Sequence, residues 1–64
     1  MLARIHDALR QGDFAAALAL SRQLVAAEPA NAEAWHLLGI ALKATGDGPG
    51  GREAVDKAIA LDPE

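Results

Sequence analysis

The chain has 64 residues and a net charge of −3, from nine acidic and six basic residues. A chain of this length forms at most one domain, and it buries only about 60% of the surface that its unfolded state exposes, which excludes a complete nucleotide-binding enzyme. Acidic and basic residues are interspersed without a basic run, so nucleic acid is not an expected partner. There is no cysteine, which excludes disulfides and thiolate chemistry.

The composition favours helices. Hydrophobic residues make up 52% of the chain, but much of this is alanine, and aromatic residues make up only 3%. Alanine, leucine, arginine and glutamate are good helix formers. The first ten residues, "MLARIHDALR", place charges among apolar residues and predict neither a signal peptide nor a membrane span. We expect a cytoplasmic location and no membrane partner.

The first half of the chain predicts two helices. The first covers about residues 2–10, because Leu2, Ile5 and Leu9 share one helical face. After "QGD", a second helix is predicted over about residues 14–27, with Asp13 as its N-cap. Pro29 then disfavours a helical conformation at the residue before it, which ends this helix.

The second half predicts another two helices. Asn31 is the expected N-cap of a helix over about residues 32–44 that is apolar nearly all round and should be the most buried one. The fourth helix is predicted over about residues 49–61, after a turn in which Gly46 adopts a left-handed cap and Asp47 or Gly48 caps the new helix.

The two halves repeat each other. Gly12-Asp13 recurs as Gly46-Asp47, and Pro29 recurs as Pro63, in both cases 34 residues later. A fixed period of this length with one helix pair per period is typical of a helical solenoid.

The second period resembles a tetratricopeptide repeat. The family pattern is W-x2-L-G-x2-Y, then A-x3-F, then a closing proline. The first period matches less well, because Ser21 stands where phenylalanine is usual, and Met1 and Arg4 stand at the tryptophan and leucine positions. The second period carries the pattern, with some replacements, at Trp35, Leu38, Gly39, Leu42, Gly51, Val55, Ala58 and Pro63.

This resemblance implies an all-α fold, with two helix-turn-helix hairpins stacked as a short right-handed solenoid. We expect one domain over residues 1–64, with hairpins over about 1–29 and 31–63. Trp35 should be largely buried between the helices of the second hairpin. Since Ala17 is the counterpart of Gly51, we also expect a methyl group to fit at Gly51.

The stretch "GDGPGG", residues 46–51, matches the dinucleotide-binding pattern G-x-G-x-x-G. That loop must follow a strand, whereas a helix is predicted here. A phosphate-binding loop is disfavoured because Arg52 replaces lysine, Glu53 stands at the magnesium-binding position, and Pro49 lacks a backbone donor. We therefore interpret the stretch as a turn between paired helices, and we predict no cofactor.

Few residues suggest catalysis, and we predict no enzyme activity and no metal site. The two histidines, together with Glu33, are candidate metal ligands, but a spacing of 30 residues is no ligand signature. The resemblance instead implies a concave groove lined by the first helix of each pair. The family's carboxylate clamp of Lys, Asn and Arg is not matched at Leu2, His6 and Leu37. The groove candidates for binding a protein or peptide are Leu2, His6, Arg10, Glu33, His36, Ile40 and Lys43.

Three functions remain open at this point. The first is a protein–protein interaction module that binds a peptide or protein segment in the groove. The second is a segment of a larger enzyme, such as a transferase or hydroxylase, that holds the substrate or the catalytic domain. The third is self-assembly: because about three repeats are usually needed for stability, we expect a homodimer or further repeats, with Val55, Ile59 and Leu61 as the self-association candidates.

Overall fold

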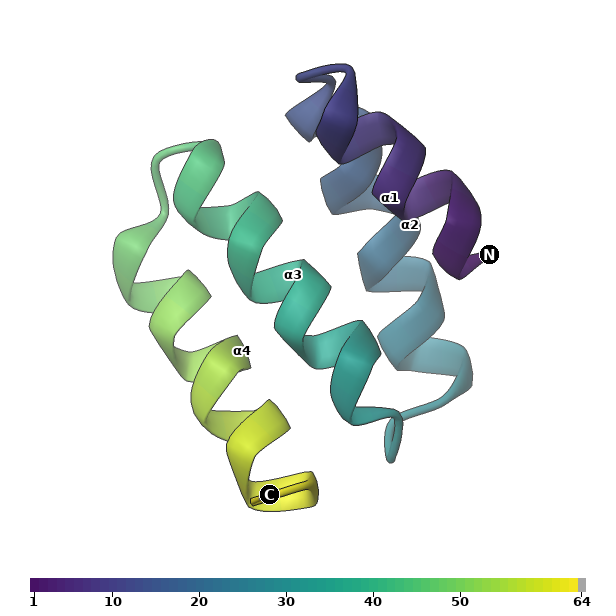
Figure 1. Cartoon of the computed structure of the whole chain (residues 1–64). Helices are drawn as coiled ribbons and strands as arrows, with labels where there is room; N and C mark the ends of the chain where they lie inside the picture. The colour runs from purple at the N-terminus through teal and green to yellow at the C-terminus, as the bar shows by residue number, and fades with distance from the viewer. Residues whose placement is uncertain (64) are drawn as a thin grey trace.

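The computed structural model describes residues 1–63 as four helices joined by short turns (Figure 1). The predicted bounds of the first three helices are confirmed, and the fourth begins one residue earlier than predicted. No strand occurs within residues 1–63. The helices are α1 (Leu2–Arg10), α2 (Phe14–Ala27), α3 (Ala32–Ala44) and α4 (Gly48–Leu61).

An acidic or amide side chain caps the start of each of the last three helices. The carboxylate of Asp13 accepts a hydrogen bond from the Ala16 backbone N–H at 3.2 Å, and Asn31 does the same for Ala34 at 3.2 Å. The Asp47 carboxylate accepts from the Gly50 N–H at 2.9 Å, so Asp47 is the cap of α4. Each cap satisfies a backbone donor that the first helical turn leaves free.

The turns inside the two hairpins have the same geometry. Gly12 and Gly46 have φ values of 76° and 97°, in the left-handed region that favours glycine. At each turn the following aspartate N–H donates back to a helix carbonyl at 2.8 Å, from Asp13 to Ala8 and from Asp47 to Leu42. This pattern ends a helix and satisfies its last carbonyls. The 34-residue repeat of the sequence is therefore also a repeat of backbone geometry.

The central helix is α3, as predicted. It contacts each of the other three helices, and it lies between the first hairpin and α4 (Figure 1). One face of α3 packs on the first hairpin through Ala34, Leu37 and Ala41, around the fully buried Ile5. An adjacent face of α3, with Leu38 and Leu42, packs with Ala54 of α4 and with Leu18 and Val25 of α2. Residues of the first hairpin take part in both clusters, so α3 holds the two hairpins together.

The α3–α4 contact depends on two glycines. A methyl group added at Gly39 would lie 2.9 Å from the Gly51 carbonyl oxygen, and one added at Gly51 would lie 2.8 Å from the Gly39 carbonyl oxygen. The two backbones therefore approach each other at reciprocal positions where neither residue has a Cβ. The expectation that a methyl group fits at Gly51 is wrong. Its counterpart Ala17 belongs to one core cluster with Ile5, which stands at the position equivalent to Gly39, so the first hairpin has no second glycine there.

Gly51→Ala should destabilise the fold by about 1–3 kcal/mol, because the new methyl group would meet backbone atoms that cannot move aside cheaply. Gly48→Ala is the matched control, since no atom lies within 4 Å of the position of its added methyl group. It should be neutral or stabilise α4 by up to about 1 kcal/mol. Urea unfolding of both variants measures the difference, and equal stabilities would contradict the close backbone contact.

Trp35 lies at the edge of the core, so the prediction that it is largely buried is only partly right. Its ring is half-buried and packs against the cluster of Leu38, Leu42 and Ala54. Its indole N–H donates to the Pro29 carbonyl at 2.8 Å. This hydrogen bond holds the ring near the start of α3, where it stays partly exposed.

Trp35→Ala should lower the free energy of unfolding by about 2–3 kcal/mol, below the range typical of a fully buried tryptophan. Trp35→Phe keeps much of the packing and loses the hydrogen bond to Pro29, so it should cost about 1 kcal/mol. Guanidinium unfolding of the two variants gives both values. A loss above about 4 kcal/mol for Trp35→Ala would contradict the edge position.

Candidate functional site

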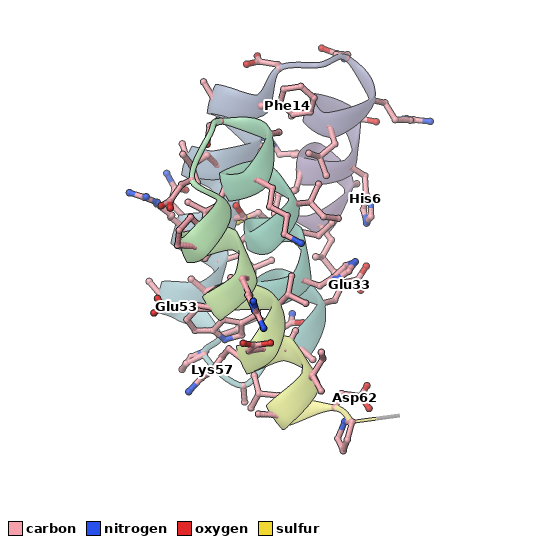
Figure 2. The ribbon with its side chains drawn as sticks, turned by 90° about the vertical axis from the view of Figure 1, so that its left-hand side faces the viewer. His6, Phe14, Glu33, Glu53, Lys57 and Asp62 are labelled. Atoms are coloured by element: carbon pink, nitrogen blue, oxygen red, sulfur yellow. The ribbon has the colours of Figure 1, made fainter. Side chains whose placement is uncertain are left out.

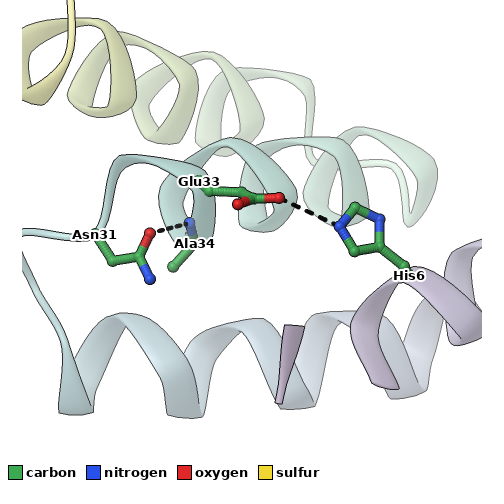
Figure 3. Close-up of polar contacts among 4 residues, drawn as sticks. All are labelled: His6, Asn31, Glu33 and Ala34. Carbon is green, nitrogen blue, oxygen red and sulfur yellow. Dashed lines mark hydrogen bonds and ion pairs between the residues drawn. The ribbon is translucent and has the colours of Figure 1, made fainter. Parts of the chain in front are cut away.

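One exposed polar contact joins the two hairpins. The His6 Nε2 atom on α1 lies 3.3 Å from the Glu33 Oε2 atom in the first turn of α3 (Figure 3). Asn31 caps α3 two residues before Glu33 and so fixes the turn that carries this carboxylate. Both side chains of the pair are about half exposed. His6 and Glu33, both groove candidates, therefore lie together, and both groups are accessible from solvent.

His36 lies on the α4 side of Glu33. The two residues line a shallow cavity of about 250 Å³ between the start of α3 and the end of α4. Asp62 also lies at this cavity, and its side chain is at the lower right of Figure 2, on the same side as Glu33 and His6. Two carboxylates and an imidazole thus share this end of the molecule. The cavity is lined by Ala32, Glu33, His36, Ala58, Ile59 and Asp62.

The other groove candidates lie in different surroundings. Leu2 is half-buried and packs against the core of the first hairpin, and Arg10 pairs with Asp7 on its own helix. Ile40 is 37% exposed, which makes it an accessible apolar side chain on α3. Lys43 lies against Gly51 of α4. The structure thus brings His6 and Glu33 together and places His36 and Lys43 toward α4.

A second hollow, of about 380 Å³, lies between α2, α3 and α4. Trp35 contributes to its wall, and the Lys57 ammonium lies 5.8 Å from the centre of the Trp35 ring, within cation–π distance. Figure 2 shows Glu53 and Lys57 on the opposite side of the molecule from His6 and Glu33. Sequence reasoning missed this hollow. The available signal was Lys57, which follows Glu53 by one helical turn and faces the tryptophan.

The only serine is not available for catalysis. Ser21 is fully buried, and its hydroxyl donates to the carbonyls of Ala17 at 2.7 Å and Leu18 at 3.1 Å. Among residues 1–63, no group of three or more histidines and carboxylates is arranged to hold a metal ion. No helix in this range is long and apolar enough to cross a membrane.

A family model for the tetratricopeptide repeat matches residues 2–64. The chain belongs to the tetratricopeptide repeat family. No curated protein and no solved structure matched the chain. Tetratricopeptide repeats are generally protein-interaction modules and are typically non-catalytic, so protein is the class of partner that this family indicates.

The pairing of His6 with Glu33 should be weak, because both side chains are about half exposed. A double-mutant cycle with His6→Ala and Glu33→Ala should give a coupling energy of about 0.2–1 kcal/mol in unfolding experiments. Arg4→Ala combined with Glu33→Ala is the control, since Arg4 is an exposed residue of α1 for which no contact with Glu33 is seen. A coupling above about 2 kcal/mol would mean that the pair is a structural clamp and not an accessible binding surface.

Proposed function

We propose that this tetratricopeptide repeat domain binds a peptide or protein segment across the surface of α1 and α3. The observation that carries this is the accessible His6–Glu33 pair, which spans the two hairpins, together with the exposed Ile40 on α3. An apolar side chain beside hydrogen-bonding groups is a common arrangement for peptide recognition. The full set of proposed contact residues is Leu2, His6, Arg10, Glu33, His36, Ile40 and Lys43.

The chemistry of this surface favours a ligand of mixed character. Ile40 offers contact area to an apolar side chain, and Glu33 offers a carboxylate to a ligand donor. Arg10 and Lys43 are the cations that could meet an acidic ligand group at the other end of the helices. The surface lacks the Lys, Asn and Arg set of the family's carboxylate clamp, so a ligand that depends on a C-terminal carboxylate is not expected.

Peptides selected from a random display library on the unmodified chain test this proposal. A variant with His6→Ala, His36→Ala and Ile40→Asp should keep its helical circular dichroism, since these side chains are exposed, and lose most of the selected peptides. The matched control is Glu53→Ala with Lys57→Ala on the opposite side (Figure 2), which should keep them. Selected peptides that bind both variants equally would place the binding surface elsewhere.

A second function is self-assembly, and one observation favours it. Ile59 is 55% exposed and Leu61 is 38% exposed, both on α4. Val55 is half-buried over Gly39 and contributes only part of its surface. Exposed large apolar side chains on one helix are candidates for contact with a second copy.

The remaining alternative is that the domain is part of a larger enzyme, such as a transferase or hydroxylase, and holds its substrate or catalytic domain. Within this domain Ser21 is buried and bonded to its own helix, so it is not available as a nucleophile. Deleting residues 1–63 from the parent protein distinguishes this alternative. Loss of activity toward a protein substrate, with retained activity toward a small analogue, would support it.

A further inference from the structure

The outer face of α4 is uncovered, whereas its counterpart in the first hairpin is covered. Residues 52, 55 and 59 are spaced by three and four positions, so they share one helical face, and Asp62, the C-cap residue of α4, lines the same cavity as Ile59. Two of the residues that lie 34 positions earlier, Leu18 and Val25, pack against the cluster that contains Leu38 and Leu42. On α4 the position equivalent to Val25 is Ile59, which is more than half exposed.

This face of α4 has an ordered distribution of charge. Arg52 lies at one end, Val55 and Ile59 lie in the middle, and Asp62 lies at the other end. The neighbouring helix α3 repeats the order, because it runs antiparallel to α4 (Figure 1). Its Lys43 lies beside Gly51 at the basic end, and its Glu33 shares the shallow cavity with Asp62 at the acidic end.

Such a face is complementary to itself in one orientation. The midpoint between positions 52 and 62 is position 57, and the midpoint between positions 55 and 59 is also position 57. If two copies of α4 lie antiparallel about a two-fold axis near position 57, Arg52 faces Asp62 of the second copy, and Val55 faces its Ile59. A two-fold interface requires this reciprocity of contacts.

The other face-to-face arrangement is disfavoured by charge. A two-fold axis parallel to the helices would place α3 over α4 of the second copy with their acidic ends together. Glu33 would then lie over Asp62 of the second copy, and Lys43 would lie over its Arg52. Like charges placed in this way are repulsive and suppress that orientation.

We propose that two copies of this chain associate through this face, with α4 antiparallel to α4 of the second copy, Ile59 near the centre, and Arg52 and Asp62 paired between the copies. The arrangement rests on the self-assembly function proposed above and gives it an orientation. Leu61 lies two positions from Ile59 and therefore points to a different side of the helix. It is not part of this contact.

Asp56 limits the strength of this association. It is exposed and lies next to the central apolar residues, so the two-fold axis brings the two Asp56 carboxylates toward each other. Their repulsion is screened by salt. Asp56→Asn should therefore tighten the dimer several-fold at low ionic strength, and a weaker dimer would contradict this position of the axis.

Sedimentation equilibrium over a range of micromolar concentrations tests the association itself. The unmodified chain should show a concentration-dependent dimer, and Ile59→Glu should be a monomer with unchanged helical circular dichroism. Ile59→Ser gives the same readout if the glutamate variant is unfolded. A chain that stays monomeric throughout overturns the association. A dimer that survives both substitutions overturns this interface and indicates exchange of a hairpin through the turn at residues 45–47.

A charge exchange tests the orientation. Arg52→Glu alone and Asp62→Lys alone should each weaken the dimer about tenfold or more, and the double variant should restore it. Arg52 lies near the start of α4, and Asp62 is the C-cap residue about 15 Å further along its axis, so they cannot pair within one chain and the restoration must come from contacts between copies. Lys57→Glu on the opposite side (Figure 2) carries the same charge change as Arg52→Glu and should leave the dimer unchanged.

These experiments distinguish failure of the antiparallel arrangement from failure of self-assembly itself. If Ile59→Glu dissociates the dimer but the double charge variant stays as weak as the single ones, the antiparallel arrangement is overturned while self-assembly stands. Sedimentation is measured on the chain without peptide, so a failure of peptide binding to α1 and α3 would not affect that result.

Discussion

The arrangement of the molecule depends on the reciprocal backbone contact between Gly39 and Gly51. Each glycine lies where a methyl group would come within 3 Å of the other's carbonyl oxygen, so α3 and α4 approach more closely than side chains would permit. This approach brings Asp62 to the cavity that Glu33 and His36 line. It also brings Lys57 within cation–π distance of Trp35 on the other side. The shallow cavity and the Lys57–Trp35 contact therefore both depend on the absence of a Cβ atom at Gly39 and Gly51.

The bounds of the helices could be predicted because they depend on local interactions. Asp13 and Asn31 cap the helices that they were expected to cap, and Gly46 adopts the expected left-handed conformation. The environments of Trp35 and Gly51 could not be predicted as well, because they depend on residues of another helix. The comparison of Gly51 with Ala17 failed for this reason: in the first hairpin the residue that corresponds to Gly39 is Ile5, whose side chain fills the gap between the helices.

In the candidate site, too, features set within one helix could be predicted better than features that depend on a neighbouring helix. His6 and Glu33, which were grouped as groove candidates, form a contact between α1 and α3. The 34-residue repeat does not predict whether a residue at the edge of the groove faces α1 or α4. His36 and Lys43 were therefore grouped with His6, although they lie toward α4. The hollow at Trp35 was missed because its walls come from three helices, and no periodic pattern within one helix marks it.

The two proposed binding functions meet at Glu33. This carboxylate pairs with His6 on the surface proposed for a peptide, and it also belongs to the acidic end of the face proposed for a second copy. In the antiparallel arrangement the basic end of the second copy, with Lys43 and Arg52, approaches this acidic end. Lys43 and Arg52 of the second copy would therefore compete with His6 for the Glu33 carboxylate. Since coupling between two binding events is reciprocal, a peptide that engages Glu33 should weaken self-association by the same factor by which self-association weakens its binding. A peptide that contacts only Ile40 and α1 should leave the dimer unaffected.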